Sequence, residues 1–381
     1  MEHTEPPDLA ESTQSWSESS SGSWLESWSE SSSESSSWFT EDYEDFLCER
    51  SDVRRFRGAL EPAVFWSVAV VGLVGNLLVL WVYLWRGRGV CGGRGLKALT
   101  HLYLLHLCAA DLLFLLTLPL WAHQSTAGWT LGPGLCKLTA ATYKLNLFSV
   151  SLFLACIAVD RYVVIVHATA ALNSQRRRRR WARAVSVSVW LLALLLAAPE
   201  LAFATAMPQD DGHMTCRTVY PAHWGRAAKA TALSLQVSVG FFVPLVVMGG
   251  CYAVIGRRLL MTHSFHRHRP LLVVMAIVLV FIITQLPHNG VLIAELWDSQ
   301  AASLSCDQRK FLDKTGLVLQ ALAFAHPALN PFLYALIGRR FRQEVMSLLP
   351  RSSMQKKKVF LSSKSRPRTL SDSDTSQGLS L

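Results

Sequence analysis

Charged residues are scarce in this sequence. Asp, Glu, Lys and Arg make up 17% of its 381 residues, against about 25% in ordinary soluble domains. Apolar residues make up 51% and gather in seven long blocks. Each block is close to the roughly 20 residues needed to cross the hydrocarbon core of a bilayer. The scarcity of charge therefore argues against two soluble domains and for an integral membrane protein.

Lys and Arg are absent from residues 1–47, although this segment holds 12 Asp and Glu residues. The first 40 residues also lack the apolar core of a cleavable signal peptide. We therefore expect the first spanning helix to act as the insertion signal. The rest of the chain is basic, but its Lys and Arg lie in short segments between apolar blocks, so we expect no nucleic-acid partner.

Catalytic signatures are missing as well. The sequence has no paired His-x-x-x-His, no nucleophile elbow and no phosphate-binding loop, so we expect no enzyme. A transporter or channel is an alternative of another class. It would show inverted repeats or charges along a conduction path, and no repeat is visible among the apolar blocks.

Seven spans follow from the apolar blocks. Their lengths and composition predict an all-α membrane protein, a seven-transmembrane helix bundle. The expected spans are residues 60–85, 97–122, 133–166, 183–204, 227–258, 269–296 and 311–336.

The short connections between spans differ in charge. Lys and Arg cluster after the first, third, fifth and seventh spans, whereas the second connection, residues 122–132, has none. Positively charged connections stay in the cytoplasm. We therefore predict a multi-pass plasma membrane protein with an extracellular N-terminus and a cytoplasmic C-terminus.

Four segments are expected along the chain. Residues 1–47 form an acidic, Ser/Trp/Glu-repetitive tail that cannot bury enough apolar area to fold alone. Residues 48–336 form the transmembrane domain. Apolar residues at helical spacing then predict an amphipathic membrane-surface helix over 337–350. The Ser/Thr-rich residues 351–381 form a cytoplasmic tail.

Polar groups and prolines interrupt the apolar spans. Because ionisable or amide side chains are costly in lipid, each is a functional hypothesis. Prolines remove a backbone hydrogen bond and permit kinks, which suits a bundle with two packings. The polar candidates are Asn76, Asp111, Asn146, Ser149, Asp160, Arg161, His326 and Asn330, and the prolines are Pro119, Pro199, Pro244, Pro287 and Pro331.

Several of these residues form motifs that follow one another on successive spans. They are Gly75-Asn76, Leu107 to Asp111, Asp160-Arg161-Tyr162, Trp190, Pro244 with Tyr252, and Asn330-Pro331-Phe332-Leu333-Tyr334. This ordered set resembles the signature of rhodopsin-like G protein-coupled receptors.

Three further segments narrow the resemblance. Thr117-Leu118-Pro119-Leu120-Trp121, Gly128 to Gly132 and the extended motif Asp160 to Ala168 resemble chemokine receptors. The segments Cys48 to Phe56 and Cys216 to Pro221 are similar to the CC types 7, 9 and 10, with type 9 favoured and type 10 second.

Four cysteines fall on the predicted outer side, where disulfides persist, and four cysteines allow three pairings. Topology and the resemblance favour Cys136–Cys216, between the third helix and the second outer loop. The remaining pair, Cys48–Cys306, is a chemokine-receptor trait. It would tie the N-terminal segment to the top of the seventh helix.

The resemblance implies a chemokine, a small basic protein, as the ligand. Tyr43, flanked by Glu41, Asp42, Glu44 and Asp45, is a candidate for sulfation, and the acidic segment would attract a basic partner. A second contact region is expected between the helices. Its candidate ligand-binding residues are Trp121, Tyr143, Lys229, Glu295 and Gln320.

On the inner side the resemblance implies an activation switch. Arg161 is expected to pair with Asp160 at rest and to meet a G protein or Tyr252 when free. The implied coupling set is Asp160, Arg161, Tyr162, Tyr252, Pro287, Asn330, Pro331 and Tyr334. The expected partner is an inhibitory-class heterotrimeric G protein, leading to calcium signalling and chemotaxis in immune responses.

A sodium ion is the one cofactor that the sequence suggests. Asp111, Asn146 and Asn330 could supply oxygen ligands to a hard cation. The position eleven before Arg161 is Val150, where the wider superfamily often has a Ser hydroxyl. A water-filled polar network is therefore the alternative.

The C-terminal tail offers sites for receptor kinases. Phosphate groups there would bind basic arrestin surfaces. The candidates are Ser362, Ser363, Thr369, Ser371, Ser373, Thr375 and Ser376. Two functional alternatives stay open: an atypical receptor that scavenges chemokine without G protein signalling, and a receptor for a non-chemokine peptide.

Overall fold

The structure is a computed structural model that describes residues 49–82, 84, 98–167, 175–208, 212–221, 223–261, 269–301 and 305–337. Helices dominate these residues. They are α2 (Ser51–Trp81), α4 (Ala98–Leu115), α5 (Leu118–Ala127), α6 (Gly132–Val166), α8 (Gln175–Phe203), α9 (Gly225–Val237), α10 (Val243–Met261), α11 (Arg269–Ala301), α12 (Cys306–Phe324) and α13 (His326–Ile337). Two strands, β1 (Ala204–Pro208) and β2 (Met214–Thr218), complete the fold.

Within these ranges, seven helical stretches are long and apolar enough to cross a membrane. Large apolar side chains such as Val74, Leu195 and Val246 are exposed on their outer faces. In a bilayer these faces contact acyl chains, because lipid is as apolar as the side chains themselves. The predicted seven-helix fold is therefore confirmed.

Three spans are interrupted where the backbone changes its hydrogen bonding. The second span breaks between α4 and α5, just before Pro119, and Thr117 there donates its hydroxyl to the Phe114 carbonyl at 2.7 Å. The fifth span contains a π-helical segment, Ser238–Phe242, between α9 and α10. The seventh span breaks at Ala325, between α12 and α13. Pro199, Pro287 and Pro331 instead lie inside continuous helices.

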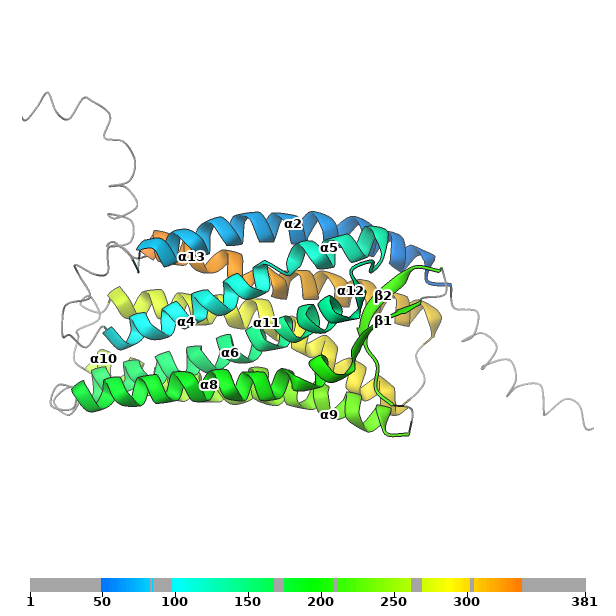
Figure 1. The fold of residues 1–381 in the computed structure, drawn as a ribbon. Helices are drawn as coiled ribbons and strands as arrows, with labels where there is room; N and C mark the ends of the chain where they lie inside the picture. Colours follow the sequence, from blue (N-terminus) through cyan, green and yellow to red (C-terminus); the bar gives the residue numbers. More distant parts are fainter. Residues whose placement is uncertain are drawn as a thin grey trace, which may run out of the picture. The chain divides into compact units, whose positions relative to one another are not determined.

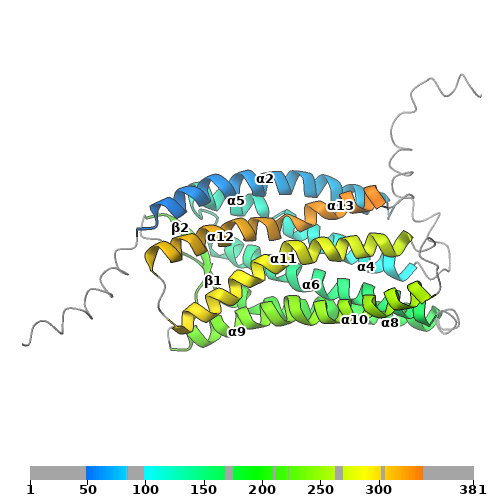
Figure 2. The ribbon, with the colours of Figure 1, turned by 180° about the vertical axis from the view of Figure 1, so that it is seen from behind.

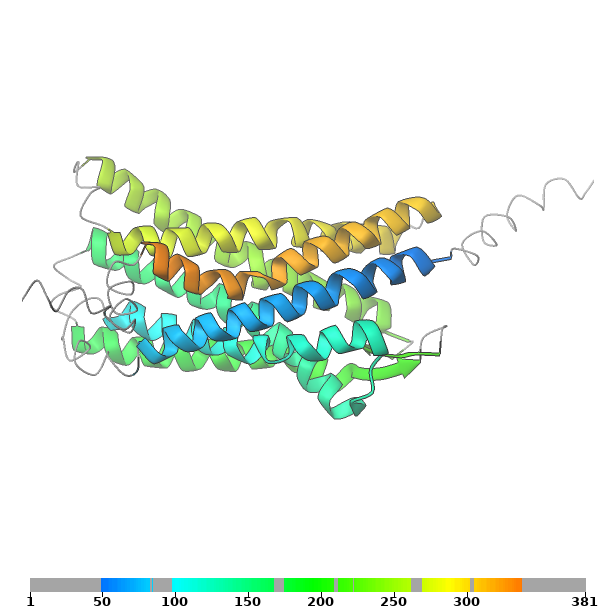
Figure 3. The same ribbon diagram turned by 90° about the horizontal axis from the view of Figure 1, so that it is seen from above.

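The helices pack lengthwise against one another (Figure 1). From behind, α9 runs beside α11, and α12 lies between α11 and α2 (Figure 2). The view from above shows α12 and α13 between α2 and α11 (Figure 3). Gly75 permits the close approach of α2 to α13, since a Cβ atom there would lie 2.7 Å from Cγ of Pro331.

A β-hairpin, which the sequence did not predict, caps one end of this bundle. Strands β1 and β2 pair antiparallel, with Ala206 opposite Cys216 (Figure 1). A disulfide joins Cys216 to Cys136 in the first turns of α6, with the two Cα atoms 5.5 Å apart. The predicted Cys136–Cys216 bridge is therefore present, and it fixes the hairpin over the third span.

Two helices begin before the predicted spans. Helix α2 begins at Ser51, nine residues before the expected start of the first span at residue 60. Helix α8 begins at Gln175, so the arginine run Arg176 to Arg180, which precedes the fourth predicted span, is helical as well. Arginine is a good helix former, and propensity therefore extends the helix beyond its apolar part. The expected amphipathic helix over 337–350 lies almost entirely outside the described residues.

Candidate functional site

The C-terminal end of α6, away from the hairpin, holds a charge cluster around Asp160. Its Oδ2 atom accepts a hydrogen bond from Arg161 Nη2 at 2.6 Å and one from the Thr100 hydroxyl at 3.0 Å. Its Oδ1 atom lies 2.5 Å from Nη2 of Arg178, the fourth residue of α8. Arg161 also donates to the Thr100 hydroxyl oxygen. Asp160 and Arg161 are buried, so their pairing offsets the cost of removing both charges from water.

Two buried polar atoms near this cluster have no hydrogen-bond partner in the ranges described. They are Nε of Arg161 and the phenol oxygen of Tyr252. Tyr252 packs with Tyr162 and Ile165 against Ile255 and Leu259. A hydroxyl that lacks a partner in this packing is free to take one in another packing, as the proposed contact between Arg161 and Tyr252 requires. The Tyr334 side chain lies outside what the structure describes.

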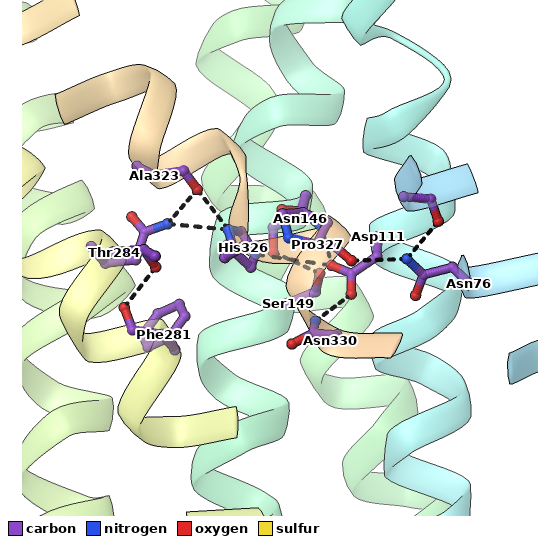
Figure 4. A network of polar contacts seen from close by, with 12 residues as sticks. Asn76, Asp111, Asn146, Ser149, Phe281, Thr284, Ala323, His326, Pro327 and Asn330 are labelled. Atoms are coloured by element: carbon purple, nitrogen blue, oxygen red, sulfur yellow. Dashed lines mark hydrogen bonds and ion pairs between the residues drawn. The ribbon is translucent and has the colours of Figure 1, made fainter. Parts of the chain in front are cut away.

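A polar network crosses the middle of the bundle (Figure 4). Asp111 on α4 accepts from the amide of Asn146 on α6 at 3.1 Å and from that of Asn330 on α13 at 2.7 Å. His326 on α13 places Nε2 4.0 Å from Oδ1 of Asp111, and its Nδ1 lies 2.7 Å from the Ala323 carbonyl. The network therefore connects the second, third and seventh spans.

Asn76 ties the first span into the same region. Its amide donates to the carbonyls of Gly72 and Pro327, each at 2.9 Å. The Pro327 carbonyl lies beside the break between α12 and α13. Asn76 thus satisfies a backbone acceptor at an irregular point of the seventh span, which lipid could not do.

The predicted sodium ligands Asp111, Asn146 and Asn330 lie together, but the two asparagines present hydrogen-bond donors, not cation ligands, to the Asp111 carboxylate. Asn146 and Asn330 each turn an N–H group toward Asp111, so both carboxylate oxygens already accept hydrogen bonds. Val150 is buried, and Ser149 donates its hydroxyl to the Asn146 carbonyl of its own helix. As arranged, these residues do not form the oxygen cage that a cation needs. Sodium binding stays a prediction, which the sodium dependence of ligand affinity would test.

Toward the hairpin end, aromatic side chains from four spans meet. Tyr143 lies 4.9 Å from Phe324 and 6.0 Å from Phe114, measured between ring centroids. Phe324 also stacks on Phe65 at 5.5 Å. Trp121 packs against this cluster, and its indole N–H has no acceptor within the described part of the chain. Trp121 and Tyr143, predicted from separate spans, thus belong to one aromatic cluster.

The sequence analysis missed a buried polar cluster beside Tyr143. Lys144 on α6 donates to the side-chain oxygen of Gln236 on α9, and its ammonium lies 3.8 Å from Oε1 of Glu200 on α8. Glu200 also accepts from the Thr218 hydroxyl on β2, and Gln236 donates to the Tyr143 hydroxyl at 3.3 Å. The cluster therefore links the hairpin to three spans.

A signal for this cluster was present in the sequence. Lys144 and Glu200 are ionisable residues inside predicted spans, the same criterion that selected Asp111. Tyr220, just after β2, packs 5.3 Å from Phe203 and 6.2 Å from Trp224, measured between ring centroids. Burial, followed by the nearby Glu200 carboxylate, raises the pKa of Tyr220.

The remaining ligand candidates are more dispersed. Lys229 near the start of α9 and Glu295 on α11 are exposed, whereas Gln320 on α12 is half-buried. Within the described residues, no hydrogen bond or ion pair joins them to one another. Pro287, a candidate for activation, is half-buried in α11 among buried Gln285, His288 and Asn289.

Several predicted site residues lie outside the described residues. They are Tyr43, Cys48 and all the phosphorylation candidates from Ser362 to Ser376. Cys306 is disulfide-bonded. Its predicted pairing with Cys48 stays a prediction. Arg50 lies 3.5 Å from Asp313 and ties the start of α2 to α12 independently of any disulfide.

Comparison with known proteins identifies the family. Residues 75–334 match the family described as 7 transmembrane receptor (rhodopsin family). The chain is 37% identical over 306 residues to C-C chemokine receptor type 9 of Ovis aries, covering 80% of this chain and 81% of that one. It is 38% identical to type 7 of Homo sapiens over 312 residues, covering 81% and 80%. It is 41% identical to type 10 of Homo sapiens over 304 residues, covering 80% and 82%.

These matches confirm the group of types 7, 9 and 10 that the motifs indicated. They also make the chain a receptor rather than an enzyme, and its seven spans make it a multi-pass plasma membrane protein. The chain therefore belongs to the C-C chemokine receptors, within the rhodopsin family of seven-transmembrane receptors.

Proposed function

We propose that this receptor binds a basic chemokine at its hairpin end and activates an inhibitory-class heterotrimeric G protein at the Arg161 end, driving calcium signalling and chemotaxis. The observation that carries this proposal is the intact pair of Asp160 and Arg161, buried at the inner end of α6 at 2.6 Å. The charge of the connections supports an extracellular N-terminus and a cytoplasmic C-terminus.

Ligand capture proceeds in two steps in this proposal. The acidic segment around Tyr43, carrying more charge if the tyrosine is sulfated, attracts the basic ligand and raises its association rate. The ligand then reaches the aromatic cluster that includes Trp121 and Tyr143, with Lys229, Glu295 and Gln320 as further contacts. Aromatic walls with a few polar groups are typical of such ligand sites.

Activation is a shift between two packings of the helices. The chemokine binds one packing better and so favours it. In that packing Arg161 leaves Asp160 and contacts the G protein or Tyr252. Receptor kinases and arrestin act afterwards on the phosphorylated tail, through the charge that phosphate adds.

The test is a screen of cells that express the chain against a full panel of chemokines, with cyclic AMP suppression and calcium release as readouts. Arg161→Ala should keep chemokine binding and abolish the suppression of cyclic AMP. Full suppression by this variant would refute the role of Arg161. Uptake of a chemokine by the unmodified receptor without either signal would favour the scavenging alternative.

The electrostatic step has a separate test. The association rate of the chemokine should fall steeply with added salt, because screening shortens the range of the attraction to about 8 Å at physiological ionic strength. Replacing Glu41, Asp42, Glu44 and Asp45 by their amides should remove most of this salt dependence. A rate that does not respond to salt would count against the acidic segment.

A further inference from the structure

Three arginines form one exposed stripe at the start of α8. Arg176, Arg180 and Arg183 are all exposed. At about 100° of rotation per residue, they fall within roughly 60° of one another around the helix axis. Arg178 lies on the opposite side, where it contacts Asp160 at 2.5 Å. The arginine run is therefore divided between the bundle interior and the outer surface.

The arginine stripe continues directly into a lipid-facing stripe. At the next helical positions along the same line lie Val187, Leu191 and Leu194, with exposed fractions of 58%, 63% and 46%. The opposite face carries Ala182 and Val189, which are only 3% and 7% exposed. The exposed apolar side chains face acyl chains in a bilayer. The three arginines therefore stand above them, on the same face, where lipid headgroups begin.

Two physical effects disfavour these arginines without an anion. The start of a helix carries a partial positive charge from the peptide dipoles, which repels cations. Residues three and four apart are also neighbours on the helix surface, so Arg180 repels both Arg176 and Arg183. None of these three pairs with an acidic side chain among the described residues, whereas Arg178 pairs with Asp160.

We propose that this stripe binds the headgroup of an anionic phospholipid, with the acyl chains lying along Val187, Leu191 and Leu194. Arginine suits this role because its planar guanidinium donates two parallel hydrogen bonds to a phosphate group. Trp181, 60% exposed in the same turns, is the kind of side chain that settles at the membrane interface. The arginine end of α8 lies opposite the hairpin end (Figure 1).

The geometry favours a lipid over a soluble anion or a protein. A soluble phosphate would contact only the arginines, so the alignment of the apolar stripe with them would add nothing to its affinity. A protein partner at this face would have to displace lipid from Val187 and Leu191. Only a molecule that is anionic at one end and apolar along its length matches the whole stripe.

The purified full-length receptor provides the test. It would be titrated in detergent with phosphatidylinositol bisphosphate, phosphatidylserine, phosphatidylcholine or a soluble inositol phosphate, and the bound molecules would be counted by native mass spectrometry. The test variant combines Arg176→Gln, Arg180→Gln and Arg183→Gln. One control replaces the same three residues by Lys, which keeps their charge. A second control, Arg257→Gln, removes an exposed arginine from α10.

Each arginine near an anionic surface is worth about fivefold in affinity, so the triple Gln variant should lose on the order of a hundredfold for anionic lipids. The Lys variant should keep most of the binding, and Arg257→Gln should change it little. Equal binding of anionic lipids to the Gln variant and the unmodified receptor would overturn the proposal. So would equal affinity for phosphatidylcholine, or soluble inositol phosphate binding as tightly as the lipid.

Discussion

Arg178 and Arg161 bind different oxygens of the same carboxylate. Arg178 Nη2 lies 2.5 Å from Oδ1 of Asp160, and Arg161 Nη2 lies 2.6 Å from Oδ2. In the proposed activation step Arg161 leaves, and Asp160 would then keep Arg178 and the Thr100 hydroxyl as partners. Arg178 thus lowers the cost of the step, because a buried carboxylate that loses its only cation is strongly destabilised.

This arrangement predicts the effect of Arg178→Gln. Without Arg178, Arg161 is the one cation that pairs with Asp160 among the described residues, so the resting packing is favoured relative to the packing in which Arg161 leaves. Basal G protein activation should fall and the ligand concentration for half-maximal response should rise about tenfold, equivalent to about 1.4 kcal/mol. Arg178→Lys, which keeps the cation, should restore most of the response. Higher basal activity in Arg178→Gln would mean that Arg178 instead holds the resting state.

The buried pair of Lys144 and Glu200 predicts an asymmetry between single and double substitutions. Lys144→Met alone leaves the Glu200 carboxylate without its cation, and should lower the free energy of unfolding by up to about 3 kcal/mol. Adding Glu200→Gln to Lys144→Met should recover part of that loss, because no buried charge then remains. Thermal unfolding of the purified receptor measures both. Additive losses would show that the two charges do not interact.

The disulfide at Cys306 predicts a loss of ligand binding on its removal. Cys306→Ala should lower chemokine affinity while surface expression persists, since the bridge to Cys48 would hold the acidic segment near the helix ends. Cys48→Ala should have the same effect, and the double variant should be no worse than either single one. Affinity that stays unchanged in both single variants would refute this role.

The close contact between Gly75 and Pro331 predicts a steric effect. Gly75→Ala places a Cβ atom only 2.7 Å from Pro331 Cγ, which is closer than non-bonded carbon atoms pack, and the proline ring cannot turn away. The variant should lose about 1–3 kcal/mol of stability, as overpacked cores do. Gly249→Ala on α10 is a matched control, since a Cβ atom there meets nothing within 4 Å. Equal unfolding temperatures for the two variants would contradict the prediction.

Much of this fold could be predicted from sequence because a membrane forces each spanning segment to form regular secondary structure by itself. Each spanning segment must satisfy its own backbone hydrogen bonds, so a long apolar run such as residues 132–166 can only be a helix. The cost of polar side chains in lipid selected Asp111, Asn146 and Asn330, which three separate spans bring into one network. The motif around Arg161 likewise indicated its pairing with its neighbour Asp160.

Other features depended on how the helices are rotated and packed. The rotation of each helix about its own axis decides which side chains meet. It places Arg178 against Asp160. It also places Lys144 between Glu200 and Gln236. The positions of the helix break before Pro119 and of the π-helical turn at Ser238–Phe242 likewise depend on how the helices pack. Hydropathy and motifs thus determined the number of helices and the polar residues within them. Tertiary structure decided which of those residues meet, because contacts between helices depend on neighbours that are distant in sequence.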